Sequence, residues 1–174
     1  LGLEPQDYDL CTNARPDEIR RVFAGFRLIL AGEKHGTVTV MMDGMPLEIT
    51  TYRTEGTYSD NRHPDSVSFT TSLREDVARR DFTMNAIAYS PVRGLIDHFG
   101  GAEDIRGGII RCVGDPDTRF REDALRMMRG IRFASALGFA IEEKTAAAIR
   151  ENKERISAVS AERIRVELTK LLCG

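Results

Sequence analysis

Two β-rich runs joined by Asp43-Gly44 constrain the fold of this chain more than any other feature. The first run covers residues 37–42 and the second covers residues 47–52. Threonine, valine and isoleucine favour strands, and Asp-Gly favours the two-residue turn of a β-hairpin. We therefore predict an antiparallel hairpin, which needs a sheet to complete it.

Acidic residues accompany the predicted strands. Residues 6–10 read as a strand in which Asp7 and Asp9 project from one face, and Glu48 points away from the apolar face of the hairpin's second strand. In a mixed sheet the two strands can lie side by side and bring the three carboxylates together. Such oxygen ligands suit Mg²⁺, which takes its other ligands from water and substrate phosphates. The pattern indicates phosphoryl transfer. The alternative is a pair of solvated turn acids and an exposed Glu48.

The chain before residue 113 mixes helices and strands. A helix is expected to begin in residues 13–18, with Pro16 in its first turn. Residues 54–71 are polar and predict a flexible loop, and residues 95–97 and 109–113 are short strand candidates around Gly-Gly turns. The expected buried stripe of the first helix consists of Ile19, Val22, Phe23 and Phe26.

The chain after Gly114 reads as helical throughout. One helix is predicted from Asp115-Pro116 to Leu137, a second from 142 to 153, and a third after Ser160. The expected apolar stripe of the third helix consists of Ile164, Leu168, Leu171 and Leu172. We predict an α+β fold with a mixed-sheet domain at 1–113 and an all-helical domain at 114–174.

Composition narrows the class of protein. The 174 residues carry a net charge of −2, which argues against a broad basic surface that grips nucleic acid without regard to sequence. Cys11, Cys112 and Cys173 are widely spaced and form no CxxC pair, so a reducing cytoplasm fits best. We expect neither a membrane-spanning segment nor a zinc site.

A second polar cluster combines Arg79, Arg80 and Asp81 with Asn85. Guanidinium groups can fork onto phosphate oxygens, and a carboxylate or amide can bond ribose hydroxyls. The cluster therefore has the groups that a ribonucleotide requires. The alternative is an ordinary charged helix start.

A third cluster, Glu122, Asp123, Arg126 and Arg129, falls within the predicted long helix. Spacings of three and four residues would put Asp123 and Arg126 on one face and let Glu122 brace Arg126. The carboxylate could accept from the exocyclic amine of cytosine or adenine while the arginine donates to the ring; uracil and guanine carry a carbonyl there. The alternative is a solvent-exposed ladder of salt bridges.

Taken together, these segments resemble the class II tRNA nucleotidyltransferases (CCA-adding enzymes) and the similar bacterial poly(A) polymerases, members of the polymerase-β-like nucleotidyltransferase superfamily. The resemblance covers nearly the whole chain. It rests on six ordered motifs: residues 7–9, 47–53, 79–86, 114–116 with 119–120, 122–126, and 162–164 with 167–168.

The resemblance implies a role for each candidate residue. Asp7 and Asp9 would hold catalytic Mg²⁺, and Glu48 would be the supporting third acid. The residues implied to contact the nucleotide are Arg80, Asp81 and Asn85 for triphosphate and ribose, Asp123 and Arg126 for the base, Glu122 to orient Arg126, and Arg129 for phosphate. Residues 54–71 would be the family's flexible loop, implicated in switching from CMP to AMP addition, and the two domains its head and neck.

The implied activity is template-independent transfer of CMP and AMP from CTP and ATP to the 3′ end of tRNA. Alternatives are a poly(A) polymerase, a non-catalytic nucleotide- or RNA-binding module, and helices that form only a dimer interface. The family's Gly-Gly turn and the helix before the Asp-x-Asp strand are missing, as are its helical body and tail. We therefore expect a fragment whose oligomeric state the sequence does not determine.

Overall fold

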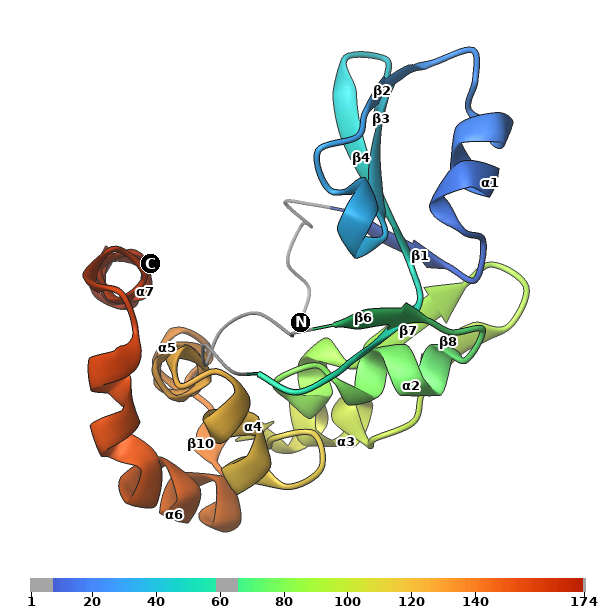
Figure 1. Cartoon of the computed structure of the whole chain (residues 1–174). Coiled ribbons are helices and arrows are strands. Elements are labelled where there is room, and N and C mark those ends of the chain that lie inside the picture. Colours follow the sequence, from blue (N-terminus) through green and yellow to red (C-terminus); the bar gives the residue numbers. More distant parts are fainter. Residues whose placement is uncertain (1–7, 59–65, 174) are drawn as a thin grey trace. The chain divides into compact units, whose positions relative to one another are not determined.

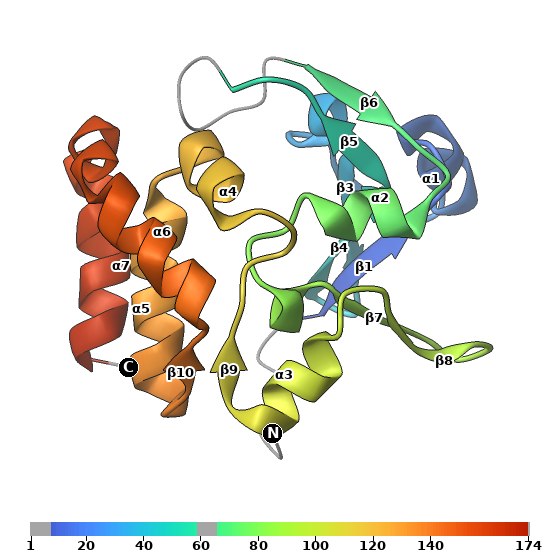
Figure 2. The same ribbon diagram turned by 90° about the horizontal axis from the view of Figure 1, so that it is seen from below.

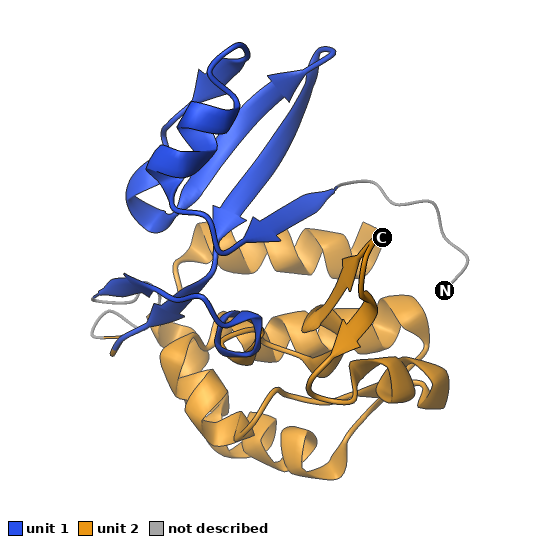
Figure 3. Cartoon of the chain, turned by 90° about the vertical axis from the view of Figure 1, so that its right-hand side faces the viewer, with its two compact units in different colours: residues 1–56, 66–76 blue, residues 57–65, 77–174 orange. Residues whose placement is uncertain are grey.

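A computed structural model describes residues 8–58 and 66–173, which divide into two compact units (Figure 3). Unit 1 comprises residues 1–56 and 66–76, and unit 2 comprises 57–65 and 77–174. The division falls at residue 76 because Phe82, Ile110 and Cys112 share one core with the helices that follow them. The boundary predicted at residue 113 concerns the family's head and neck and stays a prediction.

Unit 1 is built on a four-stranded mixed sheet in the order β1-β4-β3-β2. Its elements are β1 (Asp9–Thr12), α1 (Pro16–Val22), β2 (Arg27–Ile29), η1 (Glu33–His35), β3 (Thr37–Met42), β4 (Met45–Thr51), β5 (Arg53–Glu55) and β6 (Val67–Phe69), while α2 (Leu73–Ala78) spans the junction between the units. The β1–β4 pair is parallel and the other two pairs of the sheet are antiparallel.

The hairpin predicted at Asp43-Gly44 is confirmed. Met42 pairs with Met45, so the turn has two residues, and both have positive φ: 50° at Asp43 and 83° at Gly44. That combination defines the type I′ turn, whose twist matches that of the strands.

Helix α1 covers one face of this sheet (Figure 1). Ile19 packs there with Val38, Val40 and Ile49. Because α1 ends at Val22 after seven residues, the stripe predicted for a longer helix was partly wrong: Val22 is 75% exposed, and Phe26, which follows the helix, is 45% exposed.

The loop predicted for residues 54–71 also needs correction at its two ends. Strands β5 and β6 form an antiparallel ribbon in which Arg53 pairs with Phe69 and Glu55 with Val67. The ribbon's backbone pairing stabilises a segment that lacks an apolar period of its own. Residues 59–65 lie outside the described residues.

Unit 2 carries two short strand pairs and a group of helices (Figure 2). Its elements are η2 (Thr83–Asn85), β7 (Ile87–Ser90), β8 (Gly94–Asp97), α3 (Gly101–Gly107), β9 (Ile109–Ile110), α4 (Pro116–Glu122), α5 (Leu125–Leu137), β10 (Ala140–Ile141), α6 (Glu143–Asn152), η3 (Lys153–Ala158) and α7 (Ala161–Cys173). Strands β7 and β8 pair antiparallel, and β9 and β10 pair parallel.

The single helix predicted from Asp115-Pro116 to Leu137 is two helices. Asp123 separates α4 from α5 in an extended conformation, with φ −148° and ψ 106°. Its Oδ1 accepts a hydrogen bond from the backbone N–H of Leu125 at 3.1 Å, which satisfies a donor at the start of α5. The Asp123 side chain therefore caps the start of α5. Because Asp123 is not helical, the spacing of residues along a helix does not predict where its side chain points.

Other details of unit 2 differ from the prediction. Helix α3 occupies the segment expected to be Gly-Gly turns, and β10 lies in the part expected to be wholly helical. The stripe predicted on α7 was wrong for Leu168 (42% exposed) and Leu172 (74% exposed), whereas Glu167 on that helix is buried. In the described part of the chain, no helix is long and apolar enough to cross a bilayer.

Candidate active site

In unit 1, the sheet places two of the three predicted acids side by side. Asp9 of β1 and Glu48 of β4 are Cα partners in the parallel pair, so their side chains project from the same face. That face lies opposite Ile49 and its core, and both acids are exposed. Asp7 lies outside the described residues.

The donor set of this face fits a hard divalent cation. Two carboxylates on adjacent strands, about 4.8 Å apart at the backbone, offer oxygen ligands that Mg²⁺ accepts alongside water and phosphate oxygens. Among the residues that the structure describes, which exclude Asp7, no cluster of three or more potential metal ligands occurs.

In unit 2, Asp81 is the centre of a buried polar network. Its Oδ1 accepts from Asn85 Nδ2 and the backbone N–H of Phe82, each at 2.9 Å, and its Oδ2 accepts from Arg129 Nε at 2.7 Å. Burial alone would raise the pKa of Asp81, but the charge of Arg129 and these hydrogen bonds hold the pKa below its usual value. Asp81 is therefore ionised and fixes the orientation of Asn85, whose Oδ1 stays an acceptor.

Arg80 and Arg129 differ in their surroundings. Arg80 Nε is buried and has no hydrogen-bond partner among the described residues. Arg129 bonds Asp81, and its Nη1 lies 3.7 Å from Glu167 Oε1 of α7. In this arrangement Arg129 joins two acids.

Glu122 contacts Arg126 as the spacing predicted. Glu122 Oε2 lies 2.6 Å from Arg126 Nη1, and Glu122 Oε1 lies 2.7 Å from Arg119 Nη2. Arg126 also donates to the backbone carbonyl of Arg79 at 3.3 Å. Burial would lower the pKa of Arg126, but the charge and hydrogen bond of Glu122 keep it above its usual value, so this guanidinium is charged at every physiological pH.

The carboxylate of Asp123 pairs with Arg163 of α7. Arg163 Nη2 lies 2.7 Å from Asp123 Oδ2, and Nη1 lies 3.2 Å from Oδ1. The expectation that Asp123 and Arg126 share a helix face was wrong, because Asp123 precedes α5 instead of belonging to it.

A family model described as the poly(A) polymerase head domain matches residues 1–111. The chain belongs to this family. A second model, described as the probable RNA and SrmB-binding site of polymerase A, matches residues 138–174. The fold and the family predicted from the sequence are thus confirmed.

Several curated proteins that are similar to this chain are CCA-adding enzymes. The chain is 52% identical to the Enterococcus faecalis enzyme over 168 residues, which are 97% of the chain and 41% of that protein. It is 51% identical to the Geobacillus kaustophilus enzyme over 174 residues, 100% of the chain and 43% of that protein. The chain therefore spans less than half the length of these relatives.

Solved structures of the same kind share the fold. The Bacillus stearothermophilus CCA-adding enzyme in complex with CTP matches with a TM-score of 0.88 and 47% identity, over 99% of this chain and 41% of that one. The Thermotoga maritima CCA-adding enzyme complexed with tRNA matches with a TM-score of 0.76 and 27% identity, over 99% and 40% of the two chains.

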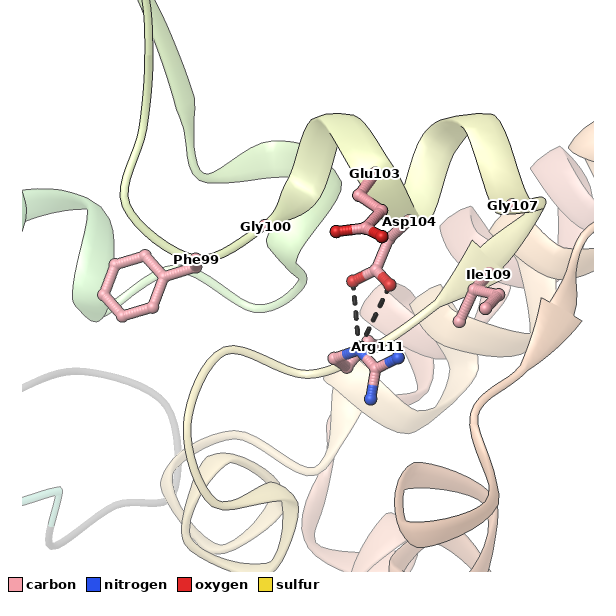
Figure 4. Close-up of a pocket in the computed structure, with 7 residues that line it drawn as sticks. All are labelled: Phe99, Gly100, Glu103, Asp104, Gly107, Ile109 and Arg111. Atoms are coloured by element: carbon pink, nitrogen blue, oxygen red, sulfur yellow. Dashed lines mark hydrogen bonds and ion pairs between the residues drawn. The ribbon is translucent and has the colours of Figure 1, made fainter.

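This member of the family also has a cavity of about 470 Å³ that includes none of the predicted site residues (Figure 4). Its lining consists of Phe99, Gly100, Glu103, Asp104, Gly107, Ile109 and Arg111. Asp104 and Arg111 point toward one another there, with Arg111 Nε 3.0 Å from Asp104 Oδ2, and Arg111 Nη1 lies 3.3 Å from Glu142. These ion pairs tie α3 to the segments after β9 and β10, which is a structural role.

Two residues near the predicted site received no role from the sequence. Arg163 and Glu167 are four residues apart on α7 and pair with Asp123 and with Arg132, respectively. An opposite-charge pair at this spacing is common on exposed helices, so nothing in the pattern separates it from a solvated one. The signal that identifies Glu167 is its burial, at 5% exposure.

Proposed function

We propose that this chain is the nucleotide-binding and catalytic part of a CCA-adding enzyme, which transfers CMP and AMP from CTP and ATP to the 3′ end of tRNA. The observation that carries the proposal is the pairing of Asp9 with Glu48 on an exposed sheet face, in a chain about half identical to CCA-adding enzymes. In the proposed reaction the terminal 3′-hydroxyl oxygen attacks the α-phosphorus, and pyrophosphate leaves.

Asp7 and Asp9 are the proposed Mg²⁺ ligands, with Glu48 as the third acid. The bound cation would lower the pKa of the attacking hydroxyl and neutralise charge on the leaving group. Asp9 and Glu48 themselves supply exposed negative oxygens whose spacing is set by backbone pairing, so their position does not depend on side-chain packing.

Residues of unit 2 are proposed to hold the nucleotide. Asp81 would bond the ribose directly and keep Asn85 in place through the 2.9 Å contact with Asn85 Nδ2. Arg80 would contact the triphosphate through its terminal amino groups, and Arg129 would assist while paired with Asp81.

Asp123 and Arg126 would read the base. A carboxylate that accepts from the exocyclic amine and a guanidinium that donates to the ring select cytosine and adenine against uracil and guanine. Glu122, 2.6 Å from Arg126, would hold that guanidinium in position. Under this proposal residues 1–113 are the head and residues 114–174 the neck. The enzyme would act in the cytoplasm, which suits cysteines that form no disulfide among the described residues.

A transfer assay tests the proposal. The complete protein that contains this chain is incubated with tRNA lacking CCA and with each labelled nucleotide triphosphate in turn, with Mg²⁺ or with excess chelator. We expect CMP to be added first, AMP to be added after it, and both to require Mg²⁺. Unchanged transfer by the double variant Asp7→Ala with Asp9→Ala would exclude the proposed metal site.

A poly(A) polymerase is the second candidate, favoured by the family model matched at residues 138–174. The same assay separates the two activities, because long adenylate tails formed without CTP would replace CCA addition. Binding of CTP without any transfer would instead indicate a non-catalytic nucleotide-binding module.

A further inference from the structure

Both terminal nitrogens of Arg163, on α7, donate hydrogen bonds to the carboxylate of Asp123. The contacts are 2.7 Å from Nη2 to Oδ2 and 3.2 Å from Nη1 to Oδ1. The side chains are only 22% and 14% exposed, so solvent competes weakly for either group. A guanidinium that bonds both oxygens of a carboxylate fixes the plane of that carboxylate as well as its distance.

The backbone does not orient Asp123 by itself. The residue sits between α4 and α5 in an extended conformation, where no helical turn restrains the side chain. Its neighbouring guanidinium groups, Arg119 and Arg126, are paired with Glu122. The Arg163 fork and the N–H of Leu125 are therefore the restraints on this carboxylate among the residues that the structure describes.

The two hydrogen bonds from Arg163 leave part of the Asp123 carboxylate available to a ligand. A carboxylate offers about four acceptor positions, two on each oxygen. Oδ1 accepts from Leu125 N and Arg163 Nη1, and Oδ2 accepts from Arg163 Nη2, within the described part of the chain. One acceptor position on Oδ2 is left, and its direction is set by the plane that Arg163 imposes.

We propose that Arg163 is a positioning residue for nucleotide selection. By fixing the Asp123 carboxylate, it directs the remaining Oδ2 acceptor toward the exocyclic amine of the incoming base and so sets the preference for CTP over UTP. The inference rests on the proposed function, in which Asp123 reads the base. Arg163 itself touches no part of the nucleotide.

The fold of unit 2 does not depend on Arg163 alone. One turn along α7, Glu167 Oε2 lies 2.7 Å from Arg132 Nε, and Glu167 Oε1 lies 3.7 Å from Arg129. Ile164 on the same helix packs against the main core of unit 2. These contacts hold α7 against α5, so replacing Arg163 should release the carboxylate without releasing the helix.

The test compares discrimination, measured as kcat/KM for CTP divided by kcat/KM for UTP, in the complete protein with a tRNA acceptor that awaits its first cytidine. For Arg163→Ala we expect this ratio to fall roughly tenfold or more, the scale of one bidentate contact in base recognition. Arg163→Lys retains the charge but loses the fork, so its ratio should fall by a smaller factor. The matched control is Arg165→Ala, since Arg165 is exposed on the same helix, and its ratio should not change.

The results for Asp123→Ala and Arg163→Ala distinguish a failure of this inference from a failure of the proposed function. If Asp123→Ala keeps the wild-type ratio, Asp123 does not read the base and both proposals fail at that point. If Asp123→Ala loses the preference for CTP over UTP but Arg163→Ala retains it, only the role of Arg163 is overturned. An equal loss of kcat/KM for CTP and UTP in Arg163→Ala would show a merely structural residue. Should Arg163→Ala fail to fold, Arg163→Lys decides, and a wild-type ratio in that variant overturns the inference.

Discussion

Gly101, the first residue of α3, lies so close to η2 that a single methyl group should disturb the part of unit 2 that we propose binds the nucleotide. A Cβ built at Gly101 would stand 2.1 Å from the carbonyl oxygen of Thr83 and 2.6 Å from its carbonyl carbon. Both are backbone atoms of η2, the turn that carries Asn85. No rotamer change can relieve such a contact.

The cost of Gly101→Ala follows from this geometry. The two segments must separate by about 0.9 Å to reach the 3.0 Å at which real Cβ contacts begin. Overpacking of this kind costs about 1–3 kcal/mol. Separation also strains the hydrogen bond from Thr83 Oγ1 to Asp104 Oδ2, 2.7 Å long and buried, which is worth about 1.5–3 kcal/mol as a bond to a charged group. We expect a loss of about 3–5 kcal/mol in the free energy of unfolding of unit 2.

The same helix offers a matched control. At Gly107 a Cβ would meet Ile109 Cδ1 at 3.5 Å, which is ordinary van der Waals contact, and the backbone there is not left-handed. Gly107→Ala should therefore be neutral or stabilise unit 2 by about 0.4–1 kcal/mol through the entropy of the unfolded chain.

Urea unfolding followed by helical circular dichroism measures both variants, with amide hydrogen exchange to separate unit 2 from unit 1. The expected loss corresponds to a fall in Tm of about 6–20 °C for Gly101→Ala, at roughly 2–4 °C per kcal/mol. CTP affinity should fall as well, because Asn85 moves with η2. A Gly101→Ala protein within about 1 kcal/mol of both wild type and Gly107→Ala would refute the reasoning.

Three further predictions concern charged residues. Asp81→Asn should destabilise unit 2 at neutral pH. Because the pKa of Asp81 is lower in the folded protein, its ionised carboxylate contributes its full stabilisation above the unfolded pKa near 3.8, and this stabilisation is lost as the pH falls through the folded pKa. Urea titrations of the variant and the wild type should therefore converge in acid. Glu122→Gln leaves Arg119 and Arg126 without their counter-charge and should cost about 3–5 kcal/mol, measured by the same titration, with weaker CTP binding by calorimetry. Asp9→Asn should abolish nucleotide transfer yet change Tm by less than about 2 °C, because Asp9 is exposed; active Asp9→Asn enzyme would contradict its proposed role.

Local patterns predicted the parts of the fold that local forces determine. Asp43-Gly44 predicts its hairpin because both turn residues need positive φ, and the alternation around Glu48 predicts the face on which that acid lies. The spacing of Glu122 and Arg126 likewise predicts their contact. Each of these inferences needs only neighbours within a few residues.

Long-range partners could not be predicted in the same way. Arg163 lies 40 residues from Asp123, and helical spacing, which related Asp123 only to residues on the same predicted helix, gave no signal for this contact. The break at Asp123 was missed because an aspartate that caps the next helix leaves the apolar period on both sides intact. Helix α3 was missed because the glycines at its two ends resemble turns, whereas Asp97 caps it: its carboxylate accepts from Phe99, Gly101 and Ala102.

The packing of α7 on α5 depends on charges as well as on the part of the apolar stripe that is buried. Leu168 and Leu172 are exposed, whereas Glu167 is buried and pairs with Arg132. Arg163 pairs with Asp123. Buried ion pairs add little net stability after desolvation, but breaking or mismatching one is costly. A shift of α7 by about one turn would bring Glu167 to the place of Arg163, where it would face the like charge of Asp123 and leave Arg132 unpaired. The ion pairs therefore contribute to specifying the register of α7 on which the proposed direction of the Asp123 carboxylate depends.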